Sequence, residues 1–255
     1  MIITIDGPSG AGKSTMAKLI SEFFGINNLN TGALYRTVAY TAHQHGLSWD
    51  DEDEMEITCL DIVPEYNKFT YILKELHCYY DDHLLTDEIR TDEISDGASK
   101  VSALQCVRAA LLPVQRELAK EGMIAEGRDS GTVIFPDADI KFYLDGNIVD
   151  RAQRRSLQNK TDFSVTCKAI EMRDERDLNR KIAPLKKAED AIVIDSTNKS
   201  AHDVFDEMVD HIKEKFPSLT ISPEAIKNTA NLIYNLEKDS NKEALQKQLG
   251  TSFVI

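Results

Sequence analysis

The stretch that decides the fold reads Gly7-Pro8-Ser9-Gly10-Ala11-Gly12-Lys13-Ser14, and it fits G-x-x-x-x-G-K-[ST] at every defined position. The short apolar run 2–5 precedes it, and apolar residues recur with helical spacing from Met16 to Phe24 after it. Glycines let successive backbone N–H groups turn toward phosphate oxygens, and the helix N-terminus adds partial positive charge. In this strand–loop–helix context, the sequence predicts a phosphate-binding loop rather than a chance glycine turn.

This loop predicts ATP as a ligand, with Thr15 continuing the site. Lys13 is expected to neutralise the β- and γ-phosphates, and the Ser14 hydroxyl is expected to ligate Mg²⁺.

Arginines recur with helical spacing in two stretches, Arg151, Arg154 and Arg155, and then Arg173, Arg176 and Arg180. A helix would place the second group on one face together with Asp177. Such arrays repel themselves unless anions lie among them, and phosphoryl transfer needs positive charge around several phosphates. An ordinary solvated helix, in which neighbouring acids pair with the arginines, is the alternative.

Glu126-Gly127-Arg128-Asp129 follows a predicted strand at Met123–Ala125. A carboxylate at the carboxyl end of a parallel strand faces the ligand crevice. We therefore expect Glu126 to hold Mg²⁺, directly or through water, and Arg128 and Asp129 to grip an acceptor. A structural salt bridge between Arg128 and Asp129 is the competing interpretation.

Strands and helices alternate along most of the chain. Further strands are predicted at Ile140–Leu144 and Ala191–Ile194, and a helix near Ile94–Glu121. This alternation predicts a parallel sheet with helices on both faces. Residues 59–85 are instead rich in β-branched and aromatic residues and predict an inserted lobe of two or three antiparallel strands.

The tail from about Pro217 contains no arginine, which separates it from the anion-handling part of the chain. Ser222-Pro223-Glu224 is a good helix start. Ile226, Ala230, Ile233 and Leu236 are expected to form one face of that helix. The tail therefore predicts a helical packing or partner-binding appendage.

Composition narrows the remaining possibilities. The 255 residues carry a net charge of −13, which disfavours nucleic-acid polymers as partners. No apolar run approaches the length of a membrane span, and the N-terminus lacks the pattern of a secretory signal. The four cysteines contain no C-x-x-C pair and are expected to be reduced thiols. We expect a cytoplasmic monomer without membrane contact.

Several stretches together resemble the bacterial cytidylate kinases, a family of nucleoside-monophosphate kinases. The matching stretches, in the family's order, are ITIDGPSGAGKST (3–15), NTGALYR (30–36), DEIRT (87–91), AEGRDSGTVIFPDADIKFYLD (125–145), RDERDLNRKIAPL (173–185) and IDST (194–197). The GRD-x-GTV-x-FPDA run is the most specific of them. Asn30 and Ser130 depart from the family pattern, but neither removes a group assigned to chemistry.

The resemblance implies an α/β P-loop kinase with a five-stranded parallel sheet flanked by helices. It implies a cytidylate-kinase-like domain over residues 1–216, with a core at 1–58 and 86–216. An acceptor-binding antiparallel β insertion at about 59–85 and a helical lid at about 151–180 complete this domain, and the extension 217–255 lies outside it. The implied activity is ATP-dependent phosphorylation of CMP and dCMP with Mg²⁺.

The resemblance also implies roles for individual residues. CMP would be bound by Thr31, Arg36, Ser99, Arg108, Arg128, Asp129, Asp177 and Arg180. Arg36 and Arg108 would hold its phosphate, while Ser99, Arg128 and Asp129 would read the cytosine edge. The catalytic cations would be Lys13, Arg128, Arg155, Arg173, Arg176 and Arg180. Ser196 and Thr197 would lie beside the adenine of ATP.

Other function classes remain open at this point. Asn159-Lys160-Thr161-Asp162 fits the N-K-x-D guanine motif of GTPases, but it follows a helical stretch rather than an apolar strand. A P-loop kinase for another small acceptor, such as UMP, another monophosphate or shikimate, is the main alternative. A non-catalytic nucleotide-binding regulator is a further one.

Overall fold

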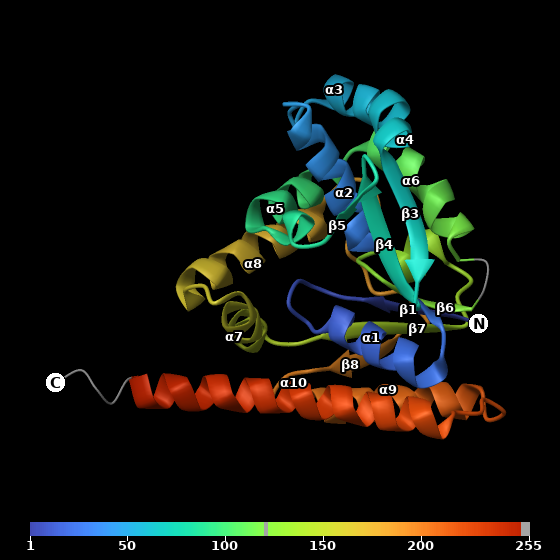
Figure 1. The fold of residues 1–255 in the computed structure, drawn as a ribbon, viewed down its shortest axis with the longest axis vertical. Coiled ribbons are helices and arrows are strands. Elements are labelled where there is room, and N and C mark those ends of the chain that lie inside the picture. The colour runs from blue at the N-terminus through green and yellow to red at the C-terminus, as the bar shows by residue number, and fades with distance from the viewer. Residues whose placement is uncertain (120–121, 251–255) are drawn as a thin grey trace.

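The computed structural model describes the backbone of residues 1–119 and 122–250, and Figure 1 shows the arrangement of the elements. Eight strands form one sheet in this part of the chain. The strands are β1 (Ile2–Asp6), β2 (Asn27–Asn30), β3 (Asn67–Ile72), β4 (Glu75–Tyr80), β5 (His83–Leu85), β6 (Met123–Glu126), β7 (Ile140–Asp145) and β8 (Ile192–Asp195).

Helices surround this sheet. They are α1 (Lys13–Phe24), α2 (Thr31–Gln44), α3 (Glu52–Ile57), α4 (Val63–Tyr66), α5 (Asp92–Val101), α6 (Gln105–Glu117), α7 (Ile148–Asn159), α8 (Phe163–Asn179), α9 (Ala201–Lys215) and α10 (Pro223–Gly250). Short π- or 3₁₀-helical turns lie at Thr58–Ile62, Glu88–Arg90 and Ser130–Ile134. No helix in the described ranges is both long and apolar enough to cross a membrane.

The predicted five-stranded parallel core is confirmed, with strand order β2-β6-β1-β7-β8. β1 lies at its centre, between β6 and β7. The chain leaves β1 through α1 and returns on the far side of β6 as β2, while later strands extend the sheet the other way. Ligand crevices of open α/β sheets lie at such a reversal, beyond the carboxyl ends of the strands.

The predicted antiparallel strands are also present, as β3, β4 and β5. They continue the main sheet through a single parallel pair, Asn28 with Glu75. Residues 59–66, which we predicted to be part of this strand-rich segment, instead lie in a helical turn and α4. Cys59 and Val63 of this helical part are buried against α2 and α6, so tertiary packing overrides the β propensity of the segment.

Two apolar cores cover the two faces of the sheet. One gathers buried residues of α2, α5 and α6, such as Leu34, Val101 and Leu111, around β2 and β6. The other packs α1 and α9 against β1 and β7 through residues such as Ile20, Phe142 and Met208. These two cores fix the strand ends on which the cleft is built.

The predicted helix at 94–121 is wrong in one respect. It is two helices, α5 and α6, because the chain turns at residues 102–104. The turn places the Ser102 carbonyl and hydroxyl where Arg108 and Arg180 donate hydrogen bonds to them. Residues 120 and 121 lie outside the described part.

The tail forms the predicted helix, and Ser222 accepts a hydrogen bond from the Ala225 N–H at its start. α10 lies along α1 and α9, as Figure 1 shows at the bottom of the view. Among residues 223–238 of this helix, the buried side chains are Thr229 and Ile233, with Leu232 packed beside them. Our prediction of the packed face is therefore wrong at three positions, because Ile226, Ala230 and Leu236 are exposed.

Candidate active site

The predicted phosphate loop joins β1 to α1 at the centre of the sheet. Gly7 has φ +149°, and a Cβ there would lie 2.0 Å from the Leu144 carbonyl oxygen. Gly10 has φ +75°, and a Cβ there would lie 3.0 Å from the Arg151 carbonyl oxygen. The glycines are thus required both by backbone conformation and by the close approach of β7 and α7.

Lys13 and Ser14 begin α1 and face the end of β6. The Lys13 ammonium is buried and donates to the Pro8 carbonyl oxygen at 2.6 Å. The Ser14 hydroxyl donates to Glu126 Oε2 at 2.7 Å, and the buried Glu126 Oε1 has no hydrogen-bond partner. The predicted pair of Mg²⁺ ligands is therefore brought together, with one carboxylate oxygen left over.

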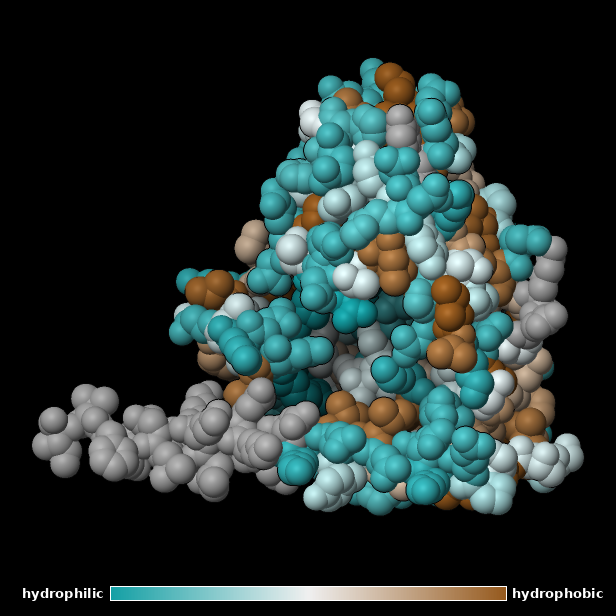
Figure 2. Space-filling view, in the orientation of Figure 1, coloured by the Kyte–Doolittle hydropathy of each residue, from teal (hydrophilic) through white to brown (hydrophobic). Residues whose placement is uncertain are grey.

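A cleft of about 410 Å³ opens in front of the loop. Figure 2 shows this face hollowed above α1, with hydrophilic residues around the opening. The cleft brings together residues that lie far apart in the sequence. The predicted site residues that line it are Ser9, Gly10, Gly12, Lys13, Ser14, Thr15, Thr31, Arg36, Ser99, Glu126, Arg128, Asp129, Arg155, Arg173, Asp177 and Arg180.

One part of this cleft carries cations without acidic partners. In the described part of the chain, no carboxylate lies within 4.0 Å of the charged nitrogens of Lys13, Arg36 or Arg173. The buried Nε atoms of both arginines also lack hydrogen-bond partners. Burial, with Arg128 adding to it, lowers the pKa of Lys13 and of Arg173, and burial lowers the pKa of Arg36. The arrangement favours binding of anions.

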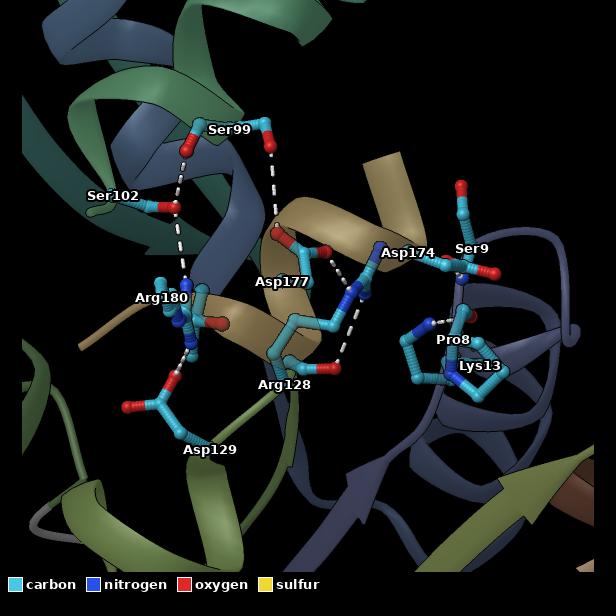
Figure 3. Close-up of polar contacts among 12 residues, drawn as sticks. Pro8, Ser9, Lys13, Ser99, Ser102, Arg128, Asp129, Asp174, Asp177 and Arg180 are labelled. Carbon is cyan, nitrogen blue, oxygen red and sulfur yellow. Dashed lines mark hydrogen bonds and ion pairs between the residues drawn. The ribbon is translucent and has the colours of Figure 1, made fainter. Parts of the chain in front are cut away.

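A second part of the cleft holds closely paired charges. Asp129 accepts hydrogen bonds from Arg108 and, at 3.1 Å, from Arg180, and Figure 3 draws the contact with Arg180. Arg128 donates to Asp177 at 2.8 Å. Burial opposes ionisation of Asp177, but Arg128 and the other nearby guanidinium groups hold its pKa below the usual value.

This pairing bears on the competing interpretation of Arg128. Its carboxylate partner is Asp177 on α8, and the alternative salt bridge to the adjacent Asp129 is not among the ion pairs of the described residues. The hydroxyls of Ser99 and Ser102 complete the cluster, at 3.4 Å from Asp177 and 3.1 Å from Arg180.

Several predicted residues lie outside the cleft. Gly7, Pro8 and Ala11 form the back of the loop. Arg108 donates to Asp129 but does not itself line the cleft, and Arg176 pairs with Asp96 on α5 at 2.9 Å. The Ser196 hydroxyl lies 3.0 Å from the guanidinium of Arg154, which lines the cleft, and Thr197 accepts from the Asn147 N–H.

Other lining residues had no predicted role. Arg90 lies within the DEIRT stretch that carried part of the resemblance, and its charge acts on Arg36. Asn30, Tyr35, Ser102 and Arg154 also line the cleft. Spacing along a helix signals Arg154, but nothing in the local sequence signals Ser102, because its position depends on the turn between α5 and α6.

The N-K-x-D stretch lies at the turn between two helices. α7 ends at Asn159, Lys160 takes a left-handed conformation, and Asp162 caps α8 by accepting from Ser164 and Val165. These four residues therefore connect the two helices rather than following a strand, which argues against a guanine site.

The fold and the site together define the class: a P-loop phosphotransferase of the nucleotide-kinase type. Residues 3–214 match the sequence model of the cytidylate kinase family. The chain belongs to the cytidylate kinase family.

Individual relatives agree with this membership. A cytidylate kinase of Geobacter sulfurreducens is 40% identical over 223 residues, covering 84% of this chain and 94% of that protein. Cytidylate kinase 1 of Haemophilus influenzae is 41% identical with the same coverage. A cytidylate kinase of a Marinomonas species is 44% identical over 214 residues, covering 80% of this chain and 91% of its own length.

Proposed function

We propose that the protein transfers the γ-phosphoryl group of ATP to CMP and dCMP. The observation that carries this proposal is one cleft with two kinds of charge. The loop and the unpaired cations at Lys13, Arg36 and Arg173 suit the polyanionic phosphates, whereas the paired set at Asp129 and Asp177 suits a neutral base and sugar. Membership of the cytidylate kinase family supports the choice of acceptor.

The transfer needs little covalent help from the protein. The acceptor phosphate is already anionic, so direct in-line attack on the γ-phosphorus requires no general base. Catalysis then rests on positioning and on cations that match the charge spread over the transferring group. We assign this task to Lys13, Arg173 and Arg155, whereas Arg128, which is paired with Asp177, belongs to the acceptor side. Closure of α7 and α8 would exclude water and suppress ATP hydrolysis.

Magnesium fits the residues beside the loop. Ser14 and Glu126 offer hard oxygen ligands, and Glu126 Oε1 is buried without a partner. Protein sites for Mg²⁺ on nucleotides commonly use one or two such oxygens together with the substrate phosphates. When bound, the ion would neutralise charge on the β- and γ-phosphates.

The acceptor side reads the base by hydrogen bonding. Asp129 is held by Arg108 and Arg180, so its carboxylate is fixed in position. We therefore propose that Arg108 acts through Asp129 on the base side, while Arg36 alone holds the acceptor phosphate. A wrong base would leave a buried polar group unpaired, at a cost of about 1–3 kcal/mol.

The proposed function also assigns a role to each segment of the chain. We propose a kinase domain over residues 1–216, with the acceptor insertion at about 59–85 and the lid at about 151–180. Binding of a partner by the extension 217–255 stays a prediction, as do a monomeric state and a cytoplasmic location.

The test is an initial-rate comparison of CMP, dCMP, UMP and AMP as acceptors with ATP and Mg²⁺. We expect CMP and dCMP to be used with similar kcat/KM, and UMP about 5- to 150-fold less well, as the cost of one unpaired polar group implies. Equal use of UMP and CMP would contradict the base reading by Asp129. Efficient use of AMP would instead point to a kinase with another acceptor.

A further inference from the structure

A buried ion pair contacts the phosphate loop at Ser9. Its members, Arg151 on α7 and Asp174 on α8, are only 7% and 8% exposed. Neither lines the cleft that holds the proposed substrates, and none of the roles assigned above uses them. A buried charge pair contributes little net stability, so its presence there calls for another explanation.

This pair holds both polar groups of one loop residue. The Ser9 N–H donates to Asp174 Oδ1 at 2.8 Å, and the Ser9 carbonyl accepts from Arg151 at 2.7 Å. Arg151 also donates to the second oxygen of Asp174 and to the Gly146 carbonyl after β7. Ser9 is thus fixed by two helices and by the end of a strand. Figure 3 shows Asp174 reaching the loop at Ser9, beside Lys13.

The same contact sets the rotation of α8. Asp174 lies one residue after Arg173 and three before Asp177, and both neighbours line the cleft. When Asp174 is anchored on the loop, α8 is held with Arg173 and Asp177 turned toward the substrates. A single buried carboxylate therefore couples the shape of the loop to the position of two cleft residues.

We propose that Asp174 and Arg151 are positioning residues for ATP: together they clamp Ser9 and preset the phosphate loop. The clamp directs the Ser9 N–H to a carboxylate, so that it is not available to phosphate. The backbone N–H groups from Gly10 onward are left for the nucleotide. The clamp itself concerns the binding of ATP. The proposal therefore rests on the proposed function only where CMP is used as the acceptor in a control measurement.

The experiment compares Asp174→Asn with Glu175→Gln, the same chemical change at the next residue, whose side chain is exposed. Calorimetry measures the Kd of ATP in the absence of any acceptor, below the unfolding temperature of each variant. We expect Asp174→Asn to weaken ATP binding about tenfold, a difference of about 1.4 kcal/mol. Glu175→Gln should bind as the unchanged protein does. In Asp174→Asn the KM for CMP should rise less than the KM for ATP, because Asp177 keeps its pairing with Arg128.

A merely structural role predicts another result. Calorimetry reports on folded protein, so a variant that is only less stable keeps its Kd for ATP. An unchanged Kd in Asp174→Asn, or an equal rise of the KM values for ATP and CMP, would overturn the proposal. If Asp174→Asn does not fold, Arg151→Lys tests the same clamp, since lysine cannot donate to three acceptors in the plane of a guanidinium. We expect it to weaken ATP binding severalfold.

Coupling between the two residues gives a second readout. If they act as one clamp, Arg151→Lys should add little to the effect of Asp174→Asn, whereas independent residues give additive changes in binding free energy. Additivity would therefore overturn the clamp. Failure of the unchanged protein to phosphorylate CMP would contradict the proposed function but would leave these ATP-binding results interpretable.

Discussion

The two parts of the cleft differ in how their charges are balanced. Around Asp129 and Asp177, every nearby guanidinium of Arg108, Arg128 and Arg180 reaches a carboxylate. Beside the phosphate loop, Lys13 and Arg173 are buried or half-buried with no carboxylate within ion-pair distance among the described residues.

This difference follows from the chemistry each part serves. A paired guanidinium has its directional donors fixed and its charge cancelled, which suits recognition of a neutral base. An unpaired buried cation is costly in the folded protein and gains most when an anion arrives. The comparison teaches that the sign and balance of charge, rather than the number of arginines, separate a phosphate site from a base site.

The largest expected effect comes from removing the loop cation. Lys13→Ala should lower kcat about 1,000-fold, because a preorganised charge at the transferring group is lost. Initial rates with ATP and CMP measure this. Lys18→Ala is the matched control on the same helix, since its exposed ion pair with Glu75 at 3.1 Å lies outside the cleft and should leave kcat unchanged. Turnover that survives in Lys13→Ala would place the catalytic charge elsewhere.

A second prediction separates the two parts by stability. Without nucleotide, Arg173→Met should raise the free energy of unfolding by about 1 kcal/mol, because an unbalanced buried charge disappears. Arg180→Met should lower it by about 3 kcal/mol, because it breaks a buried pair with Asp129. Urea unfolding measures both.

Activity should not follow this order, since both variants are expected to lose turnover. Saturating ATP should also stabilise the unchanged protein more than Arg173→Met, because only bound ligand shifts the unfolding equilibrium. A loss of stability in both variants would remove the distinction between the paired and unpaired parts.

A third prediction tests whether the C-terminal extension 217–255 influences either part of the cleft. Ile233→Ala on α10 should lower the free energy of unfolding by about 2 kcal/mol, because it leaves a cavity in the apolar core that Ile233 shares with α1. Ile226→Ala is the matched control. It removes the same atoms from another face of α10, where Ile226 is 50% exposed. The ratio of kcat/KM for CMP and UMP should not change in either variant. A changed ratio would mean that α10 influences the base-reading half through α1.

How much of the fold and of the site could be predicted depends on how far apart in the sequence the contacting residues lie. The loop, its flanking strand and helix, and the contact of Ser14 with Glu126 followed from a local motif and from the rule that parallel strands end at one edge. The partners of Arg128 and Arg108 did not follow, because they depend on how α5, α6 and β6 pack in space. The helical spacing of Arg173, Arg176 and Arg180 also misleads, since α8 ends at Asn179 and Arg176 turns to Asp96.

The clamp on Ser9 shows the same limit. The array of arginines with nearby acids was compatible with an ordinary ion-paired helix, and for Asp174 the pairing is real. Its partner is a residue on the preceding helix, 23 positions away, and its second contact is a loop residue 165 positions away. Periodicity along one helix contains no information on either.

The smallest expected effect concerns Asp6, a buried acid whose partners among the described residues are backbone N–H groups, with no guanidinium among them. Its oxygens accept from the Ser130 and Gly131 N–H groups at 2.8 and 2.7 Å, in the loop that follows Asp129. Burial raises its pKa to about 6, against the opposing effect of these two hydrogen bonds. Backbone dipoles alone thus compensate a buried charge less well than the guanidinium groups that hold Asp177 ionised.

The sign of the pH effect follows from where the proton resides. Between the unfolded pKa of 3.8 and the folded pKa of about 6, the native state keeps a proton on Asp6 that the unfolded chain has lost. Stability from this group therefore falls as pH rises. Relative to Asp6→Asn, which does not titrate, the free energy of unfolding should fall by about 1 kcal/mol between pH 5.5 and 7.5. Urea unfolding of both proteins at the two pH values measures this. A difference that stays constant would show that the two N–H groups balance the charge of Asp6 as fully as the guanidinium groups balance that of Asp177.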